Sequence, residues 1–309
     1  MVRESMDVEE KAGSYLEVRG VGKTIGTTPV LGGVSFEVGR GECFCVLGEN
    51  GSGKTTLLRI ITGLVAPTEG MVLLEGISPH EDPVASLARM GALIGIPAFY
   101  PNISAYENLR LFWDGPLKAA DTHIMNALSA VGLADEKKKK VGVFSRGMLQ
   151  RLGIAHACMH QRPYIILDEP TQGVDEYWTA KMRDLFRDMI NTGKAFIITS
   201  HDFEFVMNLC SHVLILAEGR PAYVGDLKAI AEYPYYFHLR CSPADKAETV
   251  FTQVDYIHKR IRSGDEFYLT LPDGRASELV KALVTAGCRV HECAKKHYSI
   301  ADLIRQRSE

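Results

Sequence analysis

The feature that most constrains the fold is a glycine-rich loop between an apolar run and an amphipathic run. Residues 48–55 read Gly-Glu-Asn-Gly-Ser-Gly-Lys-Thr and fit the pattern G-x-x-x-x-G-K-[ST]. Residues 43–47 are apolar and predict a buried strand, and residues 54–64 carry apolar side chains at helical spacing. The chain is therefore predicted to pass from a strand through this loop into a helix, as α/β folds do.

The residue types in the loop suit the phosphates of a nucleotide. Glycine lets the main chain take positive φ, so backbone N–H groups can converge on anionic oxygens beside a helix N-terminus. Lys54 adds a cation for the outer phosphates, and the Thr55 hydroxyl is a ligand for Mg²⁺. We therefore predict binding of a nucleoside triphosphate. The expected contacts come from Gly48, Asn50, Gly51, Ser52, Gly53, Lys54, Thr55 and Thr56.

A second group of candidate residues follows two further apolar runs. Residues 163–167 end in Asp168 and Glu169 and predict a central parallel strand, and residues 195–199 predict another, followed closely by His201. In open α/β sheets the ligand lies beyond the carboxyl ends of the strands. Asp168 is then placed to hold Mg²⁺, Glu169 to deprotonate the attacking water, and His201 to donate a hydrogen bond to the γ-phosphate.

Length and composition limit the class of protein. The 309 residues suggest about two domains, and a net charge of −3 gives no general attraction to nucleic acid, so no nucleic-acid partner is expected. No apolar run approaches the roughly 18 residues that cross a bilayer, and residues 1–11 are polar without a signal-peptide core. Seven scattered cysteines suit free thiols. These features predict a chain that stays in the cytosol.

The rest of the first part predicts three short strands and a helical insertion. Residues 15–21, 34–38 and 71–74 read as strands, with a polar turn at 22–29. Residues 86–152 read as mostly helical, and Ser104 with Glu107 forms a capping box at the start of one helix. The charge run at 136–140 is either a solvated loop face or a contact for an acidic partner or an anionic lipid.

The pattern changes from residue 233 onward. The predicted strands are 236–240, 256–261, 266–271 and 289–293, and the predicted helices are 244–251, 276–286 and 300–307. Up to residue 293 this is the order βαββαβ of a small ferredoxin-like unit. The nearby Cys288, His291, Cys293 and His297 fit no common zinc spacing, so no metal site is expected there. Nothing in this part carries catalytic chemistry, which favours a dimer-stabilising or regulatory role.

Two further segments complete a resemblance to the ATP-binding cassette of ABC transporters. Residues 144–151 read Phe-Ser-Arg-Gly-Met-Leu-Gln-Arg, a variant of the L-S-G-G-Q signature, and residues 173–175 match the D-loop. The resemblance covers residues 14–230 and implies an α/β P-loop NTPase of ABC type, with a RecA-like parallel core, an antiparallel β subdomain and a helical subdomain at about 95–155. Residues 233–309 would form the small C-terminal α+β domain. They resemble the tail of drug-exporting ABC ATPases of the bacitracin and daunorubicin type.

The resemblance implies that two chains share each ATP. In this family the P-loop of one cassette and the signature of another close over one nucleotide, so Ser145 and Gly147 would face the partner's γ-phosphate, with Asp175 of the D-loop nearby. A homodimer is the economical expectation, and a heterodimer with a paralogue stays open. Two residues depart from the family: Ile25 stands near the aromatic residue that stacks on adenine, and Gly95 stands at the glutamine that touches the metal.

We therefore expect the ATPase subunit of an ABC exporter with ATP and Mg²⁺ as cofactors. It would act in the cytoplasm, on the inner face of the membrane, and dock through residues 99–111 on a separately encoded permease. Two alternatives remain: a soluble non-transport ABC clamp, for example in cofactor assembly, and a regulatory ATP-binding protein that barely hydrolyses. The sequence does not name the cargo, and the cassette alone does not fix the direction of transport.

Overall fold

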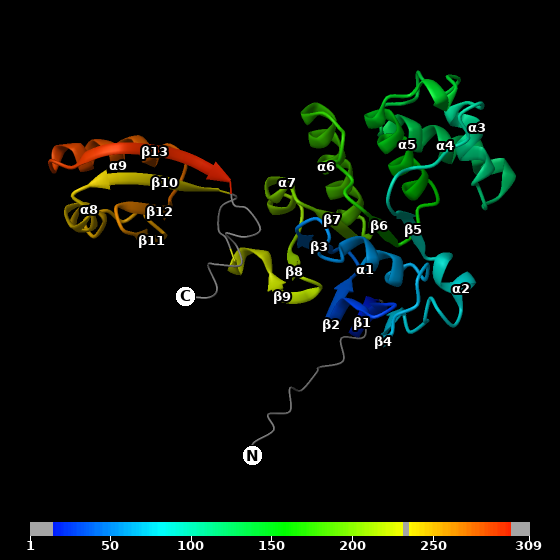
Figure 1. The fold of residues 1–309 in the computed structure, drawn as a ribbon. Helices are drawn as coiled ribbons and strands as arrows, with labels where there is room; N and C mark the ends of the chain where they lie inside the picture. The colour runs from blue at the N-terminus through cyan, green and yellow to red at the C-terminus, as the bar shows by residue number, and fades with distance from the viewer. Residues whose placement is uncertain (1–14, 231–234, 298–309) are drawn as a thin grey trace, which may run out of the picture. The chain divides into compact units, whose positions relative to one another are not determined.

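The structure, a computed structural model, describes residues 15–230 and 235–297. The chain divides into two compact units (Figure 1). The first contains the residues up to Ser200 and His212–Val224, and the second contains His201–Ser211 and the residues from Gly225 onward. The predicted domain boundary near residues 230–233 stays a prediction, and the predicted helix at 300–307 lies outside the described residues.

The first unit begins with a three-stranded antiparallel sheet in the order β2-β1-β4. Its strands are β1 (Tyr15–Ile25), β2 (Thr28–Gly39) and β4 (Glu69–Leu74). The long turn predicted at 22–29 is wrong, because β1 and β2 stay paired as far as Ile25 and Thr28. Gly26 takes a φ of 60°, which allows a turn of only two residues between them.

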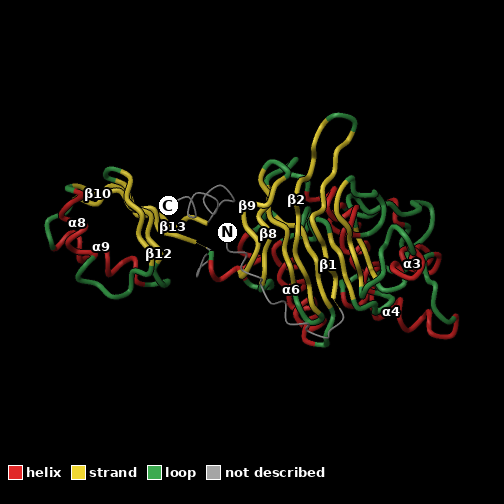
Figure 2. Tube along the Cα trace, turned by 90° about the horizontal axis from the view of Figure 1, so that it is seen from below, coloured by secondary structure: helices red, strands yellow, loops and turns green. Residues whose placement is uncertain are grey.

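The core of the first unit is a six-stranded sheet in the order β5-β6-β7-β3-β8-β9. Figure 2 shows β8 and β9 side by side in this sheet. Neighbouring strands from β5 to β8 are all parallel. Every residue of β3, β6 and β7 is buried, which explains their continuous apolar runs. The strands are β3 (Cys43–Gly48), β5 (Met90–Leu93), β6 (Tyr164–Leu167), β7 (Ala195–Ser200), β8 (His212–Ala217) and β9 (Arg220–Asp226).

Helices cover this sheet and build the helical subdomain. The helix after the glycine loop is α1 (Lys54–Ile61), and α6 (Glu176–Asn191) joins β6 to β7. Ser104 caps α3 with the predicted capping box, since its hydroxyl accepts from the Glu107 N–H and the Glu107 carboxylate accepts from the Ser104 N–H. The other helices are α2 (Pro83–Leu87), α3 (Ala105–Leu111), η1 (Leu117–Ala119), α4 (Ala120–Ala130), η2 (Val141–Val143) and α5 (Arg146–Cys158).

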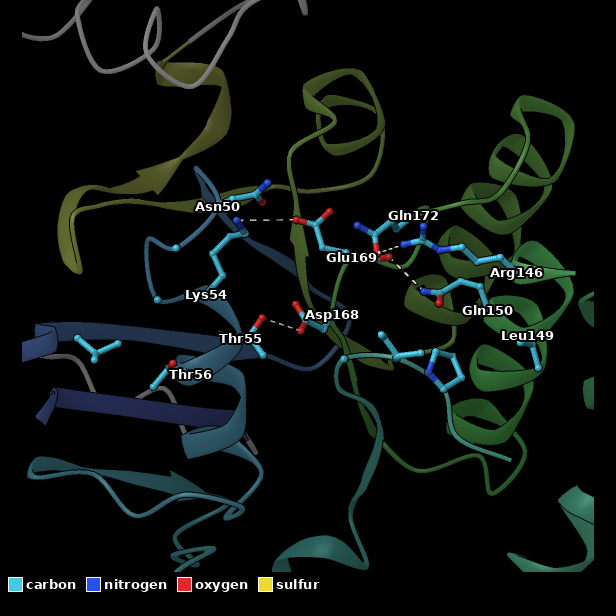
Figure 3. Close-up of a pocket in the computed structure, with 16 residues that line it drawn as sticks. Asn50, Lys54, Thr55, Thr56, Arg146, Leu149, Gln150, Asp168, Glu169 and Gln172 are labelled. Atoms are coloured by element: carbon cyan, nitrogen blue, oxygen red, sulfur yellow. Dashed lines mark hydrogen bonds and ion pairs between the residues drawn. The ribbon is translucent and has the colours of Figure 1, made fainter. Parts of the chain in front are cut away.

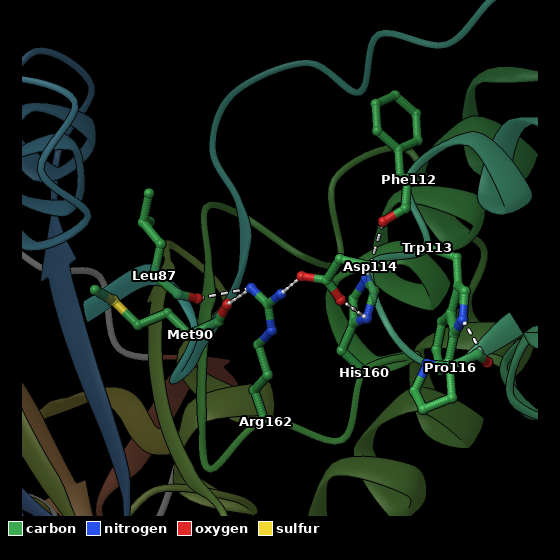
Figure 4. A network of polar contacts seen from close by, with 8 residues as sticks. All are labelled: Leu87, Met90, Phe112, Trp113, Asp114, Pro116, His160 and Arg162. Atoms are coloured by element: carbon green, nitrogen blue, oxygen red, sulfur yellow. Dashed lines mark hydrogen bonds and ion pairs between the residues drawn. The ribbon is translucent and has the colours of Figure 1, made fainter. Parts of the chain in front are cut away.

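A polar network ties the end of α5 to the strand β5 (Figure 4). The Arg162 guanidinium donates to the carbonyls of Leu87 and Met90 at 2.7 and 2.8 Å, and it also contacts the Asp114 carboxylate. Asp114 lies 2.8 Å from Nδ1 of His160, whose ring stacks on Trp113. These contacts fix the helical subdomain to the edge of the core sheet.

The second unit shows the predicted βαββαβ order in a sheet β11-β12-β10-β13 that is antiparallel throughout. Phe251 and Phe267 stack edge to face at 4.9 Å in its core. Strand β11 begins at Lys259, three residues later than predicted. The elements are α7 (Phe203–Met207), η3 (Leu227–Ala229), β10 (Tyr235–Ser242), α8 (Ala244–Phe251), β11 (Lys259–Ser263), β12 (Glu266–Thr270), α9 (Arg275–Thr285) and β13 (Arg289–His297).

Two further observations concern the cysteines near the end of the chain and the character of the helices. Cys288 is buried in the core of the second unit, whereas Cys293 is exposed and His291 contacts the Ser242 hydroxyl at 2.8 Å. Among residues 15–230 and 235–297, no group of three His, Cys, Asp or Glu side chains is arranged to hold a metal ion. Within the same ranges no helix has both the length and the apolar character to cross a membrane.

Strand β5 lies within residues 86–152, which the sequence predicts as mostly helical, and α5 packs closely on it at Gly91. A Cβ at Gly91 would lie 1.8 Å from the carbonyl oxygen of Ala157 in α5, so α5 passes directly over this strand. We expect Gly91→Ala to lower the free energy of unfolding by about 2 kcal/mol or more, measured by urea denaturation. Gly32→Ala is the control, because its Cβ would meet nothing within 4 Å and should change stability by less than about 0.5 kcal/mol. Equal effects would contradict this packing argument.

A half-buried histidine makes stability depend on pH. His156 packs edge-on against the rings of Phe99 and Phe112, and burial lowers its pKa from 6.5 to about 4. As pH falls below 6.5 the unfolded chain gains a proton that folded His156 does not accept until about pH 4, so stability is lost across this window. We expect that loss to reach about 3 kcal/mol and to shrink in His156→Leu, measured by urea denaturation at pH 7, 5.5 and 4.5. The same pH slope in both proteins would contradict this assignment.

Candidate functional site

The candidate site is a cleft of about 370 Å³ in the first unit, where β3 and β6 end (Figure 3). The glycine loop and α1 form one side of it, and α5 and the segment after β6 form the other. The lining residues are Val30, Asn50, Gly51, Gly53, Lys54, Thr55, Thr56, Gly95, Ile96, Pro97, Arg146, Leu149, Gln150, Asp168, Glu169 and Gln172. The structure therefore brings the glycine loop, Asp168 and Glu169 together, as the sequence predicted.

The glycine loop is a cradle that side chains would fill. Gly53 has a φ of 101° and directly precedes α1, and a Cβ there would lie 2.7 Å from Leu31. A Cβ at Gly48 would lie 2.3 Å from Oγ of Ser52. That Oγ is buried and has no hydrogen-bond partner within the part of the chain that the structure describes. Bare backbone, a helix N-terminus and an orphaned hydroxyl fit the phosphates of a nucleotide.

Lys54 is a nearly buried cation at the floor of this loop. It is 6% exposed, and its ammonium donates to the carbonyls of Gly48 and Glu49 at 2.7 and 3.0 Å. Its Nζ also lies 3.8 Å from Oε1 of Glu169. A cation that is removed from water is stable only beside acceptors or anions, so Lys54 makes this end of the cleft attractive to a further anion.

Asp168 joins the ends of two parallel strands to the start of α1. One carboxylate oxygen accepts from the Thr55 hydroxyl at 2.8 Å, and the other accepts from the Thr199 hydroxyl at 2.6 Å. Asp168 directly follows β6, Thr199 is the penultimate residue of β7, and Thr55 is the second residue of α1, after the loop that follows β3. A carboxylate beside a hydroxyl at a phosphate cradle is the oxygen donor set that Mg²⁺ prefers. The residues present therefore fit the metal that the sequence predicted at Thr55 and Asp168.

The main chain at Glu169 is held in an uncommon conformation. Its φ is +46°, in the left-handed region that non-glycine residues rarely adopt outside constrained sites. Its N–H donates to Oγ1 of Thr199 at 2.8 Å, and its carbonyl accepts from Nε2 of Gln150 and from the N–H of Gln172, both at 3.1 Å. Gln150, Gln172 and Thr199 were not predicted as site residues. Gln150 does lie in the signature segment, which was a signal for it.

The predicted signature residues lie at the start of α5. Ser145 is the N-cap of α5, is exposed, and accepts from the Met148 N–H at 3.2 Å. A Cβ at Gly147 would lie 2.8 Å from the carbonyl oxygen of Gly173, so the first turn of α5 nearly touches the D-loop. Asp175 caps α6 by accepting from the Trp178 N–H at 2.9 Å. None of Ser145, Gly147 and Asp175 lines the cleft of its own chain.

Three further residues that the sequence singled out, Gly95, Ile25 and His201, lie at different places relative to the cleft. Gly95 lines the cleft, has a φ of 72°, and has open space where a Cβ would be. Ile25 ends β1, is 58% exposed, and lies outside the lining of the cleft. His201 directly follows β7 and belongs to the second unit by its contacts, so its predicted role at the γ-phosphate stays a prediction.

Comparisons with a family model and with known proteins agree on the family that this chain resembles. The family model described as "ABC transporter" matches residues 31–172. Two similar curated proteins are the uncharacterized ABC transporter ATP-binding protein YhcH of Bacillus subtilis and the bacitracin transport ATP-binding protein BcrA of Bacillus licheniformis. YhcH is 32% identical over 90% of this chain and 91% of its own. BcrA is 34% identical over 76% of this chain and 78% of its own.

A solved structure agrees at the level of the fold. The dimeric ATP-binding cassette MJ0796, described as bound to ADP and Pi, superimposes with a TM-score of 0.63 at 24% identity and covers 69% of this chain and 98% of its own. With the glycine cradle, the Asp168–Thr55 pair and the signature helix in one unit, the chain belongs to the ATP-binding subunits of ABC transporters, which are ATPases coupled to transport.

Proposed function

We propose that this chain hydrolyses ATP as the subunit of an exporter and closes into a dimer around the nucleotide. The position of the signature turn carries this proposal. Lys54 and Thr55 line the cleft, whereas Ser145 and Gly147 lie outside it, and Ser145 is exposed. Although α5 lines one wall of the cleft, its Ser145 and Gly147 would not face a nucleotide bound there. Ser145 and Gly147 of a second copy, or of a paralogue, would close over that nucleotide.

Hydrolysis is assigned to groups around the cleft. Glu169 would take a proton from the attacking water, since its side chain lines the cleft opposite the P-loop. Lys54 would neutralise charge on the outer phosphates, and His201 would donate a hydrogen bond to the γ-phosphate. Thr55 and Asp168 would hold Mg²⁺, which polarises phosphoryl oxygens when bound. Ile25, exposed at the end of β1, would give adenine an apolar contact without ring stacking.

The permease would dock on the helical subdomain at residues 99–111. Large apolar side chains are exposed there and beside it, with Tyr100 at 59%, Leu111 at 63% and Phe112 at 39%. Exposed apolar groups that lie close together mark contact surfaces. The transport names of the relatives support a permease partner and a place on the cytoplasmic face of the membrane. The second unit carries none of the cleft residues, so we assign it a dimer-stabilising or regulatory role.

The shared-site proposal is tested with Glu169→Gln. Removing the general base should lower the ATPase rate at least about 100-fold while ATP binding persists, so the variant should elute as a dimer with ATP and Mg²⁺ and as a monomer without them. Light scattering after gel filtration measures this shift in mass. Adding Ser145→Ala should weaken the dimer, and Ser129→Ala on the exposed side of α4 should not. A Glu169→Gln variant that binds ATP and stays monomeric would overturn the proposal.

The open space at Gly95 leads to a second test. We propose that Mg²⁺ depends on Thr55, Asp168 and water, because Gly95 offers no side-chain ligand at its place in the cleft. Gly95→Gln should add an oxygen donor, change the ATPase rate, and lower the Mg²⁺ concentration for half-maximal activity several-fold. At a φ of 72° any residue other than glycine raises the free energy of the folded state by about 1–2 kcal/mol. Gly95→Ala is therefore the matched control for this backbone strain alone. Identical Mg²⁺ dependence in all three proteins would refute the idea.

A further inference from the structure

Arg146 is a residue of the signature turn that the proposed mechanism does not use. It stands where the L-S-G-G-Q pattern has glycine, at the first position of α5, and it lines the cleft. Its side chain is exposed, and no carboxylate lies within 4 Å of it in the part of the chain that the structure describes. A cation that lines the cleft without a carboxylate partner therefore needs a role of its own in the site.

The guanidinium of Arg146 is engaged by the segment that follows Glu169. Nη2 donates to Oε1 of Gln172 at 3.0 Å, and the side chain crosses Gly173, where a Cβ would meet Cγ, Cδ and Nε at 3.2 Å. Figure 3 shows Arg146 reaching from α5 toward Gln172 on the side where Glu169 lies. Gly173 has a φ of 75°, so its lack of a side chain serves both the turn and the arginine.

Gln172 in turn holds the main chain of Glu169. The N–H of Gln172 and the Nε2 of Gln150 both donate to the Glu169 carbonyl at 3.1 Å. The left-handed φ of Glu169 is unfavourable by itself and persists only where the surroundings fix it. One of these contacts comes from Gln150 on α5, and Arg146, one turn earlier on the same helix, reaches Gln172.

We propose that Arg146 is a positioning residue: through Gln172 it holds the loop 169–173 so that Glu169 faces the cleft of its own chain. The contact of Gly147 with Gly173 keeps the first turn of α5 and this loop at a fixed separation. A phosphate that engages the signature turn would then act on the general base of the same chain. This inference rests on the proposed role of Glu169. A competing role, in which Arg146 is a cation for the phosphate of the partner's nucleotide, predicts different variants.

The test is a swap of the hydrogen-bonding pair in the full chain. Arg146→Ala should lower kcat about tenfold and leave KM for ATP within about twofold, because the base is misplaced while the P-loop is intact. The double variant Arg146→Gln with Gln172→Arg should restore kcat to within about threefold, because the pair forms in the opposite direction. Arg59→Ala, on an exposed position of α1, is the matched control and should keep the activity of the original chain.

The outcomes distinguish the positioning role of Arg146 from its role as a cation for the partner's nucleotide, and both from a failure of the proposed function. An unchanged kcat in Arg146→Ala overturns the positioning role. A swap that stays inactive while Arg146→Lys stays active also overturns it, because charge alone would then be what matters. Thermal melting of each variant shows that the fold is kept. Glu169→Gln is measured in parallel: if it hydrolyses ATP like the original chain, the assignment of the base has failed, and that failure is distinct from a failure of Arg146.

Discussion

The hydrogen bond between Thr55 and Asp168 is the contact on which the rest of the site depends. It joins residues 113 positions apart in the sequence, and it measures 2.8 Å. Because Thr199 occupies the other oxygen of the same carboxylate, one buried side chain connects the ends of β6 and β7 with the start of α1. Removing a partner from such a buried group leaves a full desolvation penalty, so these three segments are held together strongly. The cradle, the proposed metal ligands and the proposed base keep their places relative to one another for this reason.

The charges of the cleft follow from that arrangement. Lys54 is too buried to be stable without acceptors, and the carbonyls of Gly48 and Glu49 supply them from the loop itself. Its Nζ lies 3.8 Å from Oε1 of Glu169, so the cation and the carboxylate form an ion pair at this end of the cleft. Burial strengthens each of these interactions because the effective dielectric constant falls. In the proposed mechanism the same groups would meet the phosphates and set the charge around them.

Much of the site could be predicted because its signals are local. The glycine loop, the acids at 168–169 and the cap at Ser104 each depend on neighbouring residues, and the structure has all three. What could not be predicted depends on distant segments. Strand β5 is short, and its place depends on its pairing with β6 and on the passage of α5 over Gly91. The role of Gln172 likewise needs Arg146, which lies 26 residues earlier and meets it only in the folded chain.

The direction of the side chains on α5 explains how one helix can serve two sites. Ser145 caps its exposed end, outside the cleft, whereas Gln150, just over one turn further, is buried against the carbonyl of Glu169. A rigid helix transmits a displacement at its first residue to its second turn. Gly147 packs so closely on Gly173 that the start of α5 and the loop cannot move independently. If a partner's phosphate binds at Ser145, as proposed, the same packing would carry a displacement to the proposed base of this chain. Coupling between two shared nucleotides would then arise from packing within a single subunit.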